Sequence, residues 1–247
     1  MTAGFRSLTG REFFYFPTRG SSQKRSTAYN GSRLTAAVDG GESLNPKFYE
    51  LPEERRTALI NAGFRVFSRN EYKKSPMSEI ADAAGVSKAL LFHYFGNKKG
   101  LYLFLWETCA RMTQEVLARA GCMEEDNIFD IMCAGLRAKA ALMRRYPDIG
   151  AFAIKAYYEK NPEVAPEIQA SVEKHGSFAS YGPRLKLDPA HFVPGLDLQK
   201  MYQDMYWASE GYVWELSMRG EVDVEKFEKE FTGMIDFWRS IYLRKEE

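Results

Sequence analysis

The sequence has little cysteine and no long hydrophobic run. Its 247 residues include three cysteines, Cys109, Cys122 and Cys133, whose odd number and wide spacing favour a reduced, cytoplasmic chain over a disulfide framework. No segment approaches the run of about 18 apolar residues that a membrane span requires. The first residues also lack the basic-then-apolar pattern of a secretory signal. We therefore expect a protein with no membrane partner.

Residue patterns typical of catalysis are also missing. The three histidines, His93, His175 and His191, are scattered and lack metal-ligand spacing with the cysteines. The sequence contains neither a glycine-rich phosphate loop nor a Gly-x-Ser-x-Gly nucleophile elbow. We therefore expect no enzymatic activity, no cofactor and no metal site.

Charge is balanced overall but unevenly distributed. The chain has 34 Lys/Arg and 33 Asp/Glu, for a net charge of +1. Residues 1–46 carry +3, and residues 47–100 carry +4 from ten basic and six acidic side chains, which leaves −6 for residues 101–247. A basic N-terminal part followed by an acidic remainder suggests that the N-terminal part binds a polyanion. Charge differences of this size also arise by chance.

Residues 1–46 differ in composition from the rest of the chain. Gly, Ser, Thr and Arg dominate, and no helical period survives beyond a few positions. Such a segment buries too little apolar surface to offset its ordering entropy, so we expect a disordered extension. A basic arm could add phosphate contacts, but a passive tail is the stronger expectation. A third alternative is that translation begins downstream of Met1.

The pattern from Pro52 onward is helical almost throughout. A first helix ending by Asn70 is indicated by apolar and small residues at three-and-four spacing: Leu59, Ala62, Gly63, Val66 and Phe67. Further helices are expected near 98–120, 127–145, 148–160, 163–180, 197–219 and 223–244. No sustained apolar/polar alternation argues for a sheet. The predicted fold is all-α, with about nine helices.

Two short helices joined by a tight turn are predicted within residues 75–94. Ser75 is expected to cap the first helix, with Pro76 at its first position. Gly85 supplies the left-handed conformation that ends this helix, and Ser87 caps the next one. This is the helix-turn-helix plan, in which the second helix enters the major groove of DNA.

The string Ala84-Gly-Val-Ser-Lys88, followed by Phe92-His-Tyr-Phe-Gly-Asn-Lys98, resembles the N-terminal domain of TetR-family regulators. The resemblance is strong from residue 59 to 101 and covers the rest only in helix count and in the last two helices. It implies a helix-turn-helix domain over residues 47–100 and a helical effector-binding and dimerisation domain over residues 101–247. It further implies a regulator, most often a repressor, that a small molecule releases from a palindromic operator in double-stranded DNA. Activation, or DNA binding without an effector, are the alternatives.

The resemblance also assigns DNA contacts position by position. Four side chains match positions that reach phosphates or lie against the DNA backbone: Lys88, His93, Tyr94 and Lys98. Ser87 and the exposed positions Ser78, Ala89 and Leu90 complete the predicted DNA-binding set. Phe92 departs from the tyrosine common in the family, and Ala89 and Leu90 are apolar, so readout there favours thymine methyl groups. Phe95 is expected in the core.

The acidic body is expected to hold an effector pocket and a homodimer interface. Its aromatic and methionine residues favour a largely apolar small-molecule ligand. The candidate pocket residues are Phe104, Met112, Met132, Phe152, Tyr157, Phe178, Tyr206, Trp207 and Glu210, although each of the apolar ones is more often ordinary core. The candidate interface is formed by stripes on the last two helices: Met201, Met205, Tyr212, Phe227, Phe231, Ile235 and Trp238. The alternative is that both stripes pack within their own chain.

Overall fold

The described part of the chain is built from α-helices. A computed structural model describes residues 45–121, 127–175, 187–219 and 222–245, which contain nine α-helices and no strand. The helices are α1 (Glu53–Arg69), α2 (Met77–Ala84), α3 (Lys88–Phe95), α4 (Lys98–Arg119), α5 (Ile128–Arg145), α6 (Ile149–Tyr157), α7 (Ala165–His175), α8 (Leu198–Arg219) and α9 (Val224–Tyr242). Three short 3-10 turns accompany them: η1 (Pro46–Phe48), η2 (Tyr72–Lys74) and η6 (Pro189–His191). The predicted all-α fold is confirmed.

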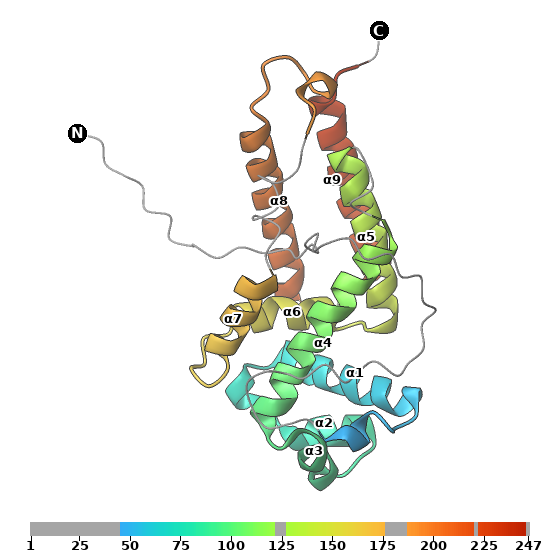
Figure 1. The fold of residues 1–247 in the computed structure, drawn as a ribbon, viewed down its shortest axis with the longest axis vertical. Helices are drawn as coiled ribbons and strands as arrows, with labels where there is room; N and C mark the ends of the chain where they lie inside the picture. Colours follow the sequence, from blue (N-terminus) through green and yellow to red (C-terminus); the bar gives the residue numbers. More distant parts are fainter. Residues whose placement is uncertain (1–44, 122–126, 176–186, 220–221, 246–247) are drawn as a thin grey trace, which may run out of the picture.

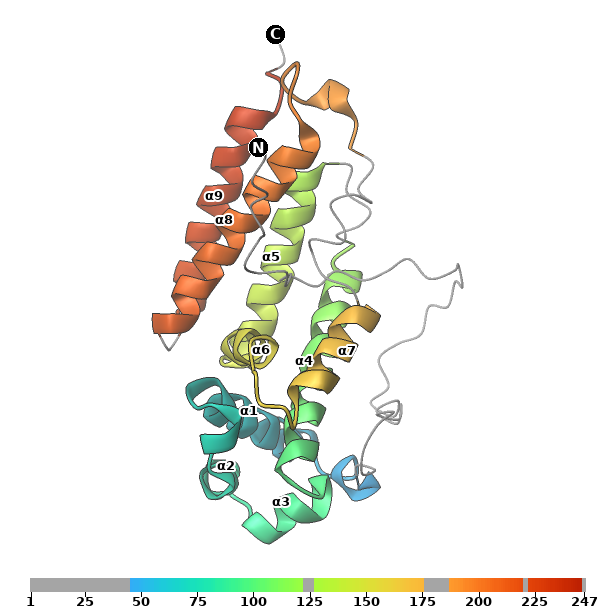
Figure 2. The same cartoon turned by 90° about the vertical axis from the view of Figure 1, so that its left-hand side faces the viewer.

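The helices form two tiers joined by α4 and α6. Figures 1 and 2 show α1, α2 and α3 at one end of the molecule and the long helices α5, α8 and α9 at the other. Helix α4 leads from the first tier to the second and packs along α5. The short α6 lies against α1 on one side and α8 on the other, so it is a direct link between the tiers.

Helix α1 is the central element of the lower tier. Glu53 and Glu54 occupy its first turn, where the positive end of the helix dipole favours acidic side chains. At the other end the Nδ2 group of Asn70 donates to the carbonyl of Val66 at 3.0 Å. The face predicted to be apolar is buried, with Leu59, Ala62, Gly63, Val66 and Phe67 all covered by neighbouring helices.

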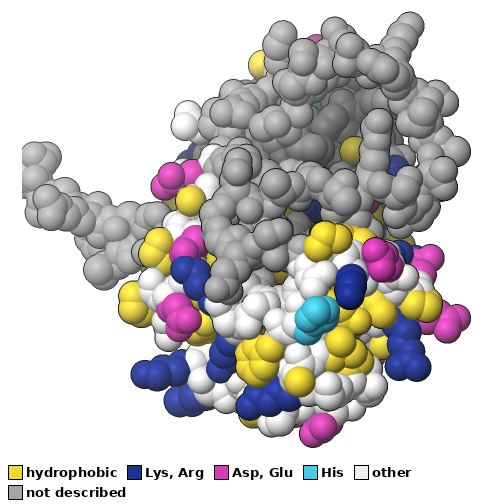
Figure 3. Space-filling model, turned by 60° about the horizontal axis from the view of Figure 1, so that its bottom comes forward, with side chains coloured by type: hydrophobic (Ala, Val, Ile, Leu, Met, Phe, Trp, Pro, Cys, Tyr) yellow, Lys and Arg dark blue, Asp and Glu magenta, His cyan; other side chains and the backbone are white. Residues whose placement is uncertain are grey.

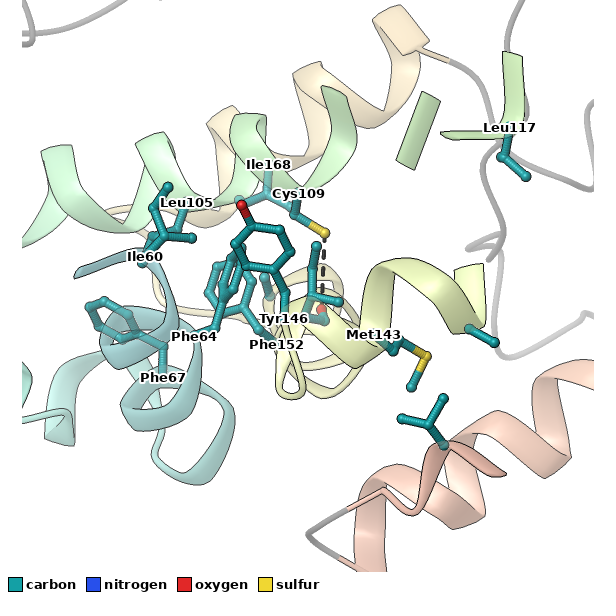
Figure 4. Close-up of a cluster of buried hydrophobic side chains, with 14 of the residues drawn as sticks. Ile60, Phe64, Phe67, Leu105, Cys109, Leu117, Met143, Tyr146, Phe152 and Ile168 are labelled. Atoms are coloured by element: carbon teal, nitrogen blue, oxygen red, sulfur yellow. Dashed lines mark hydrogen bonds between the residues drawn. The ribbon is translucent and has the colours of Figure 1, made fainter. Parts of the chain in front are cut away.

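An aromatic cluster locks α1, α4 and α6 together (Figure 4). The ring centroid of Phe152 lies 5.1 Å from Phe64 of α1 and 5.4 Å from Tyr102 of α4. Phe67 meets Tyr102 edge-on at 4.9 Å. Each such pair adds about 0.5–1.5 kcal/mol beyond its buried area. Phe152, predicted to wall an effector pocket, instead lies in this joint between the tiers.

The stripes predicted to form a dimer interface lie inside the protomer. Most of their side chains are buried in the chain's own core: Met201, Met205, Phe227, Phe231, Ile235 and Trp238. Tyr212 is half-buried, with its ring stacked 6.2 Å from that of Phe227 and its hydroxyl donating to Glu230 at 2.8 Å. An apolar stripe shows that a helix face is covered but not which chain covers it, and here the same chain covers six of the seven predicted side chains.

Across the described ranges, no helix combines the length and the hydropathy needed to traverse a lipid bilayer.

Candidate DNA-binding interface

The turn between α2 and α3 has the predicted geometry. Gly85 adopts a left-handed conformation with φ of 65°, and the N–H of Val86 donates back to the carbonyl of Ala81 at 3.0 Å. The hydroxyl oxygen of Ser87 then accepts from the N–H of Leu90 at 3.1 Å, which caps α3. The predicted roles of Gly85 and Ser87 in this turn are confirmed.

The start of α2 differs from the prediction. Ser75 is buried, and its hydroxyl donates to the carbonyl of Glu71 at 2.9 Å instead of capping the helix. Pro76 occupies the N-cap position, with no side-chain hydrogen bond. The reason is that the carbonyl of Glu71, the N-cap residue of the η2 turn, lies within reach of the Ser75 hydroxyl.

Helix α3 turns one face to the core and the other outward. Leu91 and Phe95 are buried, as expected for the core face. On the outer side Lys88, Ala89, Phe92 and His93 are exposed and Leu90 is half-buried, and Ser78 and Ser87 are also exposed. Figure 3 looks toward this end of the molecule and shows basic and apolar side chains interleaved, with a histidine among them.

A lysine and an aromatic ring share the outer face of α3. The ammonium group of Lys88 lies 5.8 Å from the ring centroid of Phe92, which is 36% exposed. A cation above a ring face is attracted by the ring quadrupole. The tyrosine common in the family is thus replaced by a ring that offers apolar surface next to a positive charge.

Tyr94, predicted to reach a phosphate or to lie against the DNA backbone, is largely covered by the protein. It is only 6% exposed, and its ring packs 5.9 Å from Phe48 and 6.2 Å from Phe95. The apolar ring gains more from this cluster than it would from water. Most of the side chain therefore belongs to the core of the DNA-binding tier.

Lys98 is folded back onto the protein. Its ammonium group donates to the carbonyl of Lys73 at 2.9 Å and lies 5.3 Å from the ring centroid of Tyr72. Burial lowers the pKa of Lys98, and the nearby Glu163 carboxylate opposes that shift. A phosphate contact by Lys98 therefore requires the side chain to leave these partners, a cost that sequence reasoning did not foresee.

The junction between α3 and α4 is tightly constrained. Asn97 caps α4, since its Oδ1 accepts from the N–H of Gly100 at 2.8 Å. A Cβ atom on Gly100 would lie 2.1 Å from the carbonyl oxygen of Phe95. The last turn of α3 can approach α4 this closely only because residue 100 has no side chain.

A structured turn ahead of α1 was missed at the sequence level. Residues 1–44 lie outside the described ranges, but Asn45 and Pro46, which were assigned to the disordered extension, begin the η1 turn. Phe48 is buried beside Tyr94, Phe95 and Phe104. The signal was available: Asn followed by Pro and then a lone large apolar residue is typical of a capped turn that packs on a core.

Acidic residues after α6 contact the helix-turn-helix tier. The Glu159 carboxylate accepts from the backbone N–H of Tyr72 at 3.0 Å. Glu167 of α7 pairs with Lys99 of α4 at 2.5 Å, and both side chains are about one-third exposed. The negative body identified in the sequence thus lies against the basic tier at the start of α4.

The predicted effector-pocket residues do not form one cluster. Phe104 packs 5.1 Å from Phe95 and belongs to the core of the DNA-binding tier, as Phe152 belongs to the joint. Trp207 is 58% exposed, so it is not a pocket wall, and Phe178 lies outside the described residues. The members that face the interior of the body, fully or in part, are Met112, Met132, Tyr157, Tyr206 and Glu210. A second polar residue joins them: burial raises the pKa of Tyr158, and its hydrogen bond with Glu210 adds to the shift.

Comparisons with known proteins agree with this geometry. Residues 59–104 match the family model described as bacterial regulatory proteins, tetR family. The chain is 47% identical over 60 residues to the transcriptional activator FasR of Mycolicibacterium smegmatis, covering 24% of this chain and 27% of that one. It is 29% identical over 75 residues to the transcriptional repressor AcnR of Corynebacterium glutamicum, covering 30% and 40%. The matched segment thus spans less than half the length of either relative.

The fold resembles that of solved structures over most of the chain. A TetR family transcriptional regulator from Chloroflexus aurantiacus superposes with a TM-score of 0.59 at 23% identity, covering 82% of this chain and 99% of that one. This likeness concerns the fold. The matched relatives are transcriptional regulators and not enzymes. From the matched helix-turn-helix segment, we conclude that residues 59–104 form a domain of the TetR family of bacterial regulatory proteins, within a two-tier helical fold like that of a solved TetR family regulator.

Proposed function

We propose that the chain is a homodimeric regulator of transcription that reads an operator in double-stranded DNA with α3. The outer face of α3 carries the proposal, because Lys88, Ala89, Phe92 and His93 are exposed on a helix held rigidly by its caps. A second helix of this kind enters the major groove, while the first crosses the DNA backbone. A role on DNA also fits the cytoplasmic location expected from the sequence.

The proposed contacts divide by chemistry. Lys88, His93 and the hydroxyls of Ser78 and Ser87 are suited to phosphates, which position the protein without reading sequence. Apolar side chains, Ala89, Leu90 and Phe92, are suited to the methyl group of thymine. Lys98 would join the phosphate set only by releasing the Lys73 carbonyl. We therefore expect the operator half-site to be rich in thymine at the positions under α3.

The proposed dimer interface moves to the outer faces of α8 and α9. Large apolar side chains are exposed there: Trp207 at 58%, Trp214 at 47%, Phe237 at 61% and Ile241 at 42%. They lie outside the buried stripes of the same helices, which meet through the stacked rings of Tyr212 in α8 and Phe227 in α9. Large apolar side chains exposed on two long helices would be covered from water by a partner, as at protein interfaces. A twofold dimer would read a palindromic site.

The proposed effector is a small, largely apolar molecule bound in the helical body, over residues 101–247. Met112, Met132, Tyr157 and Tyr206 supply apolar surface. Glu210, hydrogen-bonded to Tyr158, supplies a polar group. A ligand shifts the spacing of the two recognition helices only by its difference in affinity for the two states. Release from DNA on ligand binding is the proposed response.

We propose that the bound protein represses transcription, with activation as the alternative. A curated repressor and a curated activator both match the helix-turn-helix segment of this chain. The segment therefore supports DNA binding equally well for a repressor and for an activator. Binding that no ligand alters is the third possibility.

Fluorescence anisotropy with promoter DNA from the gene and its neighbours tests the proposal. We expect salt-sensitive, sequence-specific binding by the purified protein, weakened by Lys88→Ala for every DNA sequence because a phosphate contact is lost. Replacing thymine by uracil in the half-site should reduce affinity, since it removes only the methyl group. Binding that is indifferent to sequence would refute the proposal. Apolar ligands added to the complex then test effector release.

A further inference from the structure

Asn45 precedes α1 in the sequence but is hydrogen-bonded to the last turn of α3. Its backbone N–H donates to the carbonyl of Tyr94 at 3.0 Å. Its Nδ2 group lies 3.2 Å from the carbonyl oxygen of His93 and 3.0 Å from the Nε2 atom of the same residue. Figure 2 shows the η1 turn, drawn in blue, at the same end of the molecule as α3.

These contacts complete the C-terminal end of the recognition helix. An α-helix leaves its last four carbonyls without partners inside the helix. In α3 the first and last of these, from Phe92 and Phe95, accept from the N–H groups of Gly96 at 2.8 Å and Asn97 at 2.7 Å. Asn45 satisfies the two between them. The end of α3 is therefore held by a residue from a different part of the chain.

The hydrogen bonds fix the orientation of the Asn45 amide. Its Oδ1 accepts from the backbone N–H of Lys47 at 3.0 Å, and its Nδ2 faces a carbonyl oxygen, which can only accept. The Nδ2 group therefore donates its second hydrogen to Nε2 of His93. An imidazole whose Nε2 accepts in its neutral form carries its proton on Nδ1.

We propose that Asn45 is a positioning residue of the DNA-binding surface, which selects the Nδ1-protonated tautomer of the His93 ring so that this N–H donates to a phosphate oxygen. The proposal rests on the DNA-binding function proposed above. His93 is exposed on the outer side of α3, one turn from Ala89. Flipping the ring would place a carbon atom where Nε2 accepts from Asn45, so the bond fixes both the tautomer and the direction of the donor.

The first test uses the DNA-free full chain. Ring ¹⁵N–¹H correlation spectra are recorded at about pH 8, roughly 1.5 units above the ordinary histidine pKa. In the wild type we expect His93 to be protonated on Nδ1 and unprotonated on Nε2. Asn45→Ala and the similarly shaped Asn45→Asp, whose carboxylate only accepts, should both move the proton to Nε2. A wild-type His93 protonated on Nε2 would overturn the proposal.

The second test is a double-mutant cycle measured by DNA affinity. Asn45→Ala should weaken operator binding about tenfold, the effect of one lost hydrogen bond to a charged group. In a His93→Ala background the same change should have almost no further effect. Fully additive losses, or an unchanged affinity in Asn45→Ala, would overturn the positioning role.

A matched variant separates positioning from general destabilisation. Asn127→Ala also removes an asparagine cap, from the start of α5, where the side chain accepts from Phe129 N–H at 2.8 Å. It should leave DNA affinity unchanged, and loss of affinity in this variant equal to that of Asn45→Ala would count against the proposal. If the wild type binds no DNA, the proposed function fails and the phosphate-donor role falls with it. The tautomer measured without DNA then still reports whether Asn45 orients the ring.

Discussion

At the scale of single residues, Gly100 is the position where the fold tolerates least. A Cβ atom there would lie 2.1 Å from the Phe95 carbonyl oxygen, a backbone atom that cannot swing aside. We expect Gly100→Ala to lower the free energy of unfolding by about 2 kcal/mol or more, because α3 and α4 must separate. Urea denaturation followed by circular dichroism measures this.

The control for Gly100 is a glycine in ordinary surroundings. A Cβ atom on Gly150 of α6 would lie 3.6 Å from the Met143 methyl carbon, a normal van der Waals contact. Gly150→Ala should therefore be neutral or stabilising by up to about 1 kcal/mol, through the higher helix propensity of alanine. Equal destabilisation by the two substitutions would contradict the role given to Gly100.

Because of Cys109, the free energy of unfolding should decrease as the pH becomes alkaline. Burial raises the pKa of its thiol to about 12. The unfolded thiol ionises at about 8.5, so the unfolded state releases its proton first and stability falls as pH rises from there toward 12. Unfolding measured from pH 8 to 11 should show this decline, and Cys109→Ala should make it shallower. An identical slope in the variant would rule out the thiol as a source. Burial raises the pKa of Tyr102 as well, so part of the decline should remain.

Between elements, the pair formed by Glu167 of α7 and Lys99 of α4 links the body to the DNA-binding tier. We expect Glu167→Gln to raise DNA affinity a few-fold at low salt, for all DNA sequences, because Lys99 becomes available to phosphates and a nearby negative charge is removed. Anisotropy titrations at several salt concentrations measure the effect.

Glu173→Gln provides the comparison for this pair. It removes the same charge from an exposed position on the same helix. It should change affinity less than Glu167→Gln does. Equal gains would mean that the total charge of the body matters and that the Lys99 pair does not.

Features that neighbouring residues determine could be predicted from the sequence, whereas features that depend on the packed structure could not. Gly85 and Ser87 were predicted correctly because a left-handed turn and a helix cap are decided by neighbouring residues. The partners of Lys98 in the free protein were not predicted, since a long side chain has several partners within reach and only the packed structure selects among them. Ser75 failed for a related reason: an acceptor in the η2 turn competes for its hydroxyl.

Non-local packing limited the prediction further. Phe152 belongs to the core because of Phe64, which is distant in sequence, and Phe104 because of Phe48 and Phe95 in two other elements. No periodic pattern within one helix identifies such partners. The burial of Tyr94 was not predicted, because Phe48, which covers it, lies next to a segment expected to be disordered. The all-α class required only the helical period, so it could be predicted without knowing any contact.

At the scale of the whole molecule, the exposed apolar face of α8 and α9 predicts a dimer. Phe237→Asp should weaken self-association at least about a hundredfold, because twofold symmetry places the charge in the interface twice. Phe237 is 61% exposed, so the protomer should remain folded. Sedimentation velocity over a range of concentrations measures the change.

A remote acidic substitution controls for the added charge. Ala141→Asp introduces the same group at an exposed position of α5. It should leave the association constant unchanged. If Phe237→Asp sediments like the wild type, the interface lies elsewhere.

The apolar outer face of α3 has a consequence for how recognition responds to temperature. Phe92 is 36% exposed in the free protein and is flanked by Ala89 and Leu90, so a fitted operator would remove apolar surface from water. Burial of apolar surface lowers the heat capacity of a complex. The enthalpy of operator binding should therefore become more favourable on warming, whereas loose, phosphate-only association should change much less. The heat capacity change of binding should therefore distinguish operator DNA from other DNA sequences. The difference should come from Ala89, Leu90 and Phe92, three side chains that form no hydrogen bonds to a base.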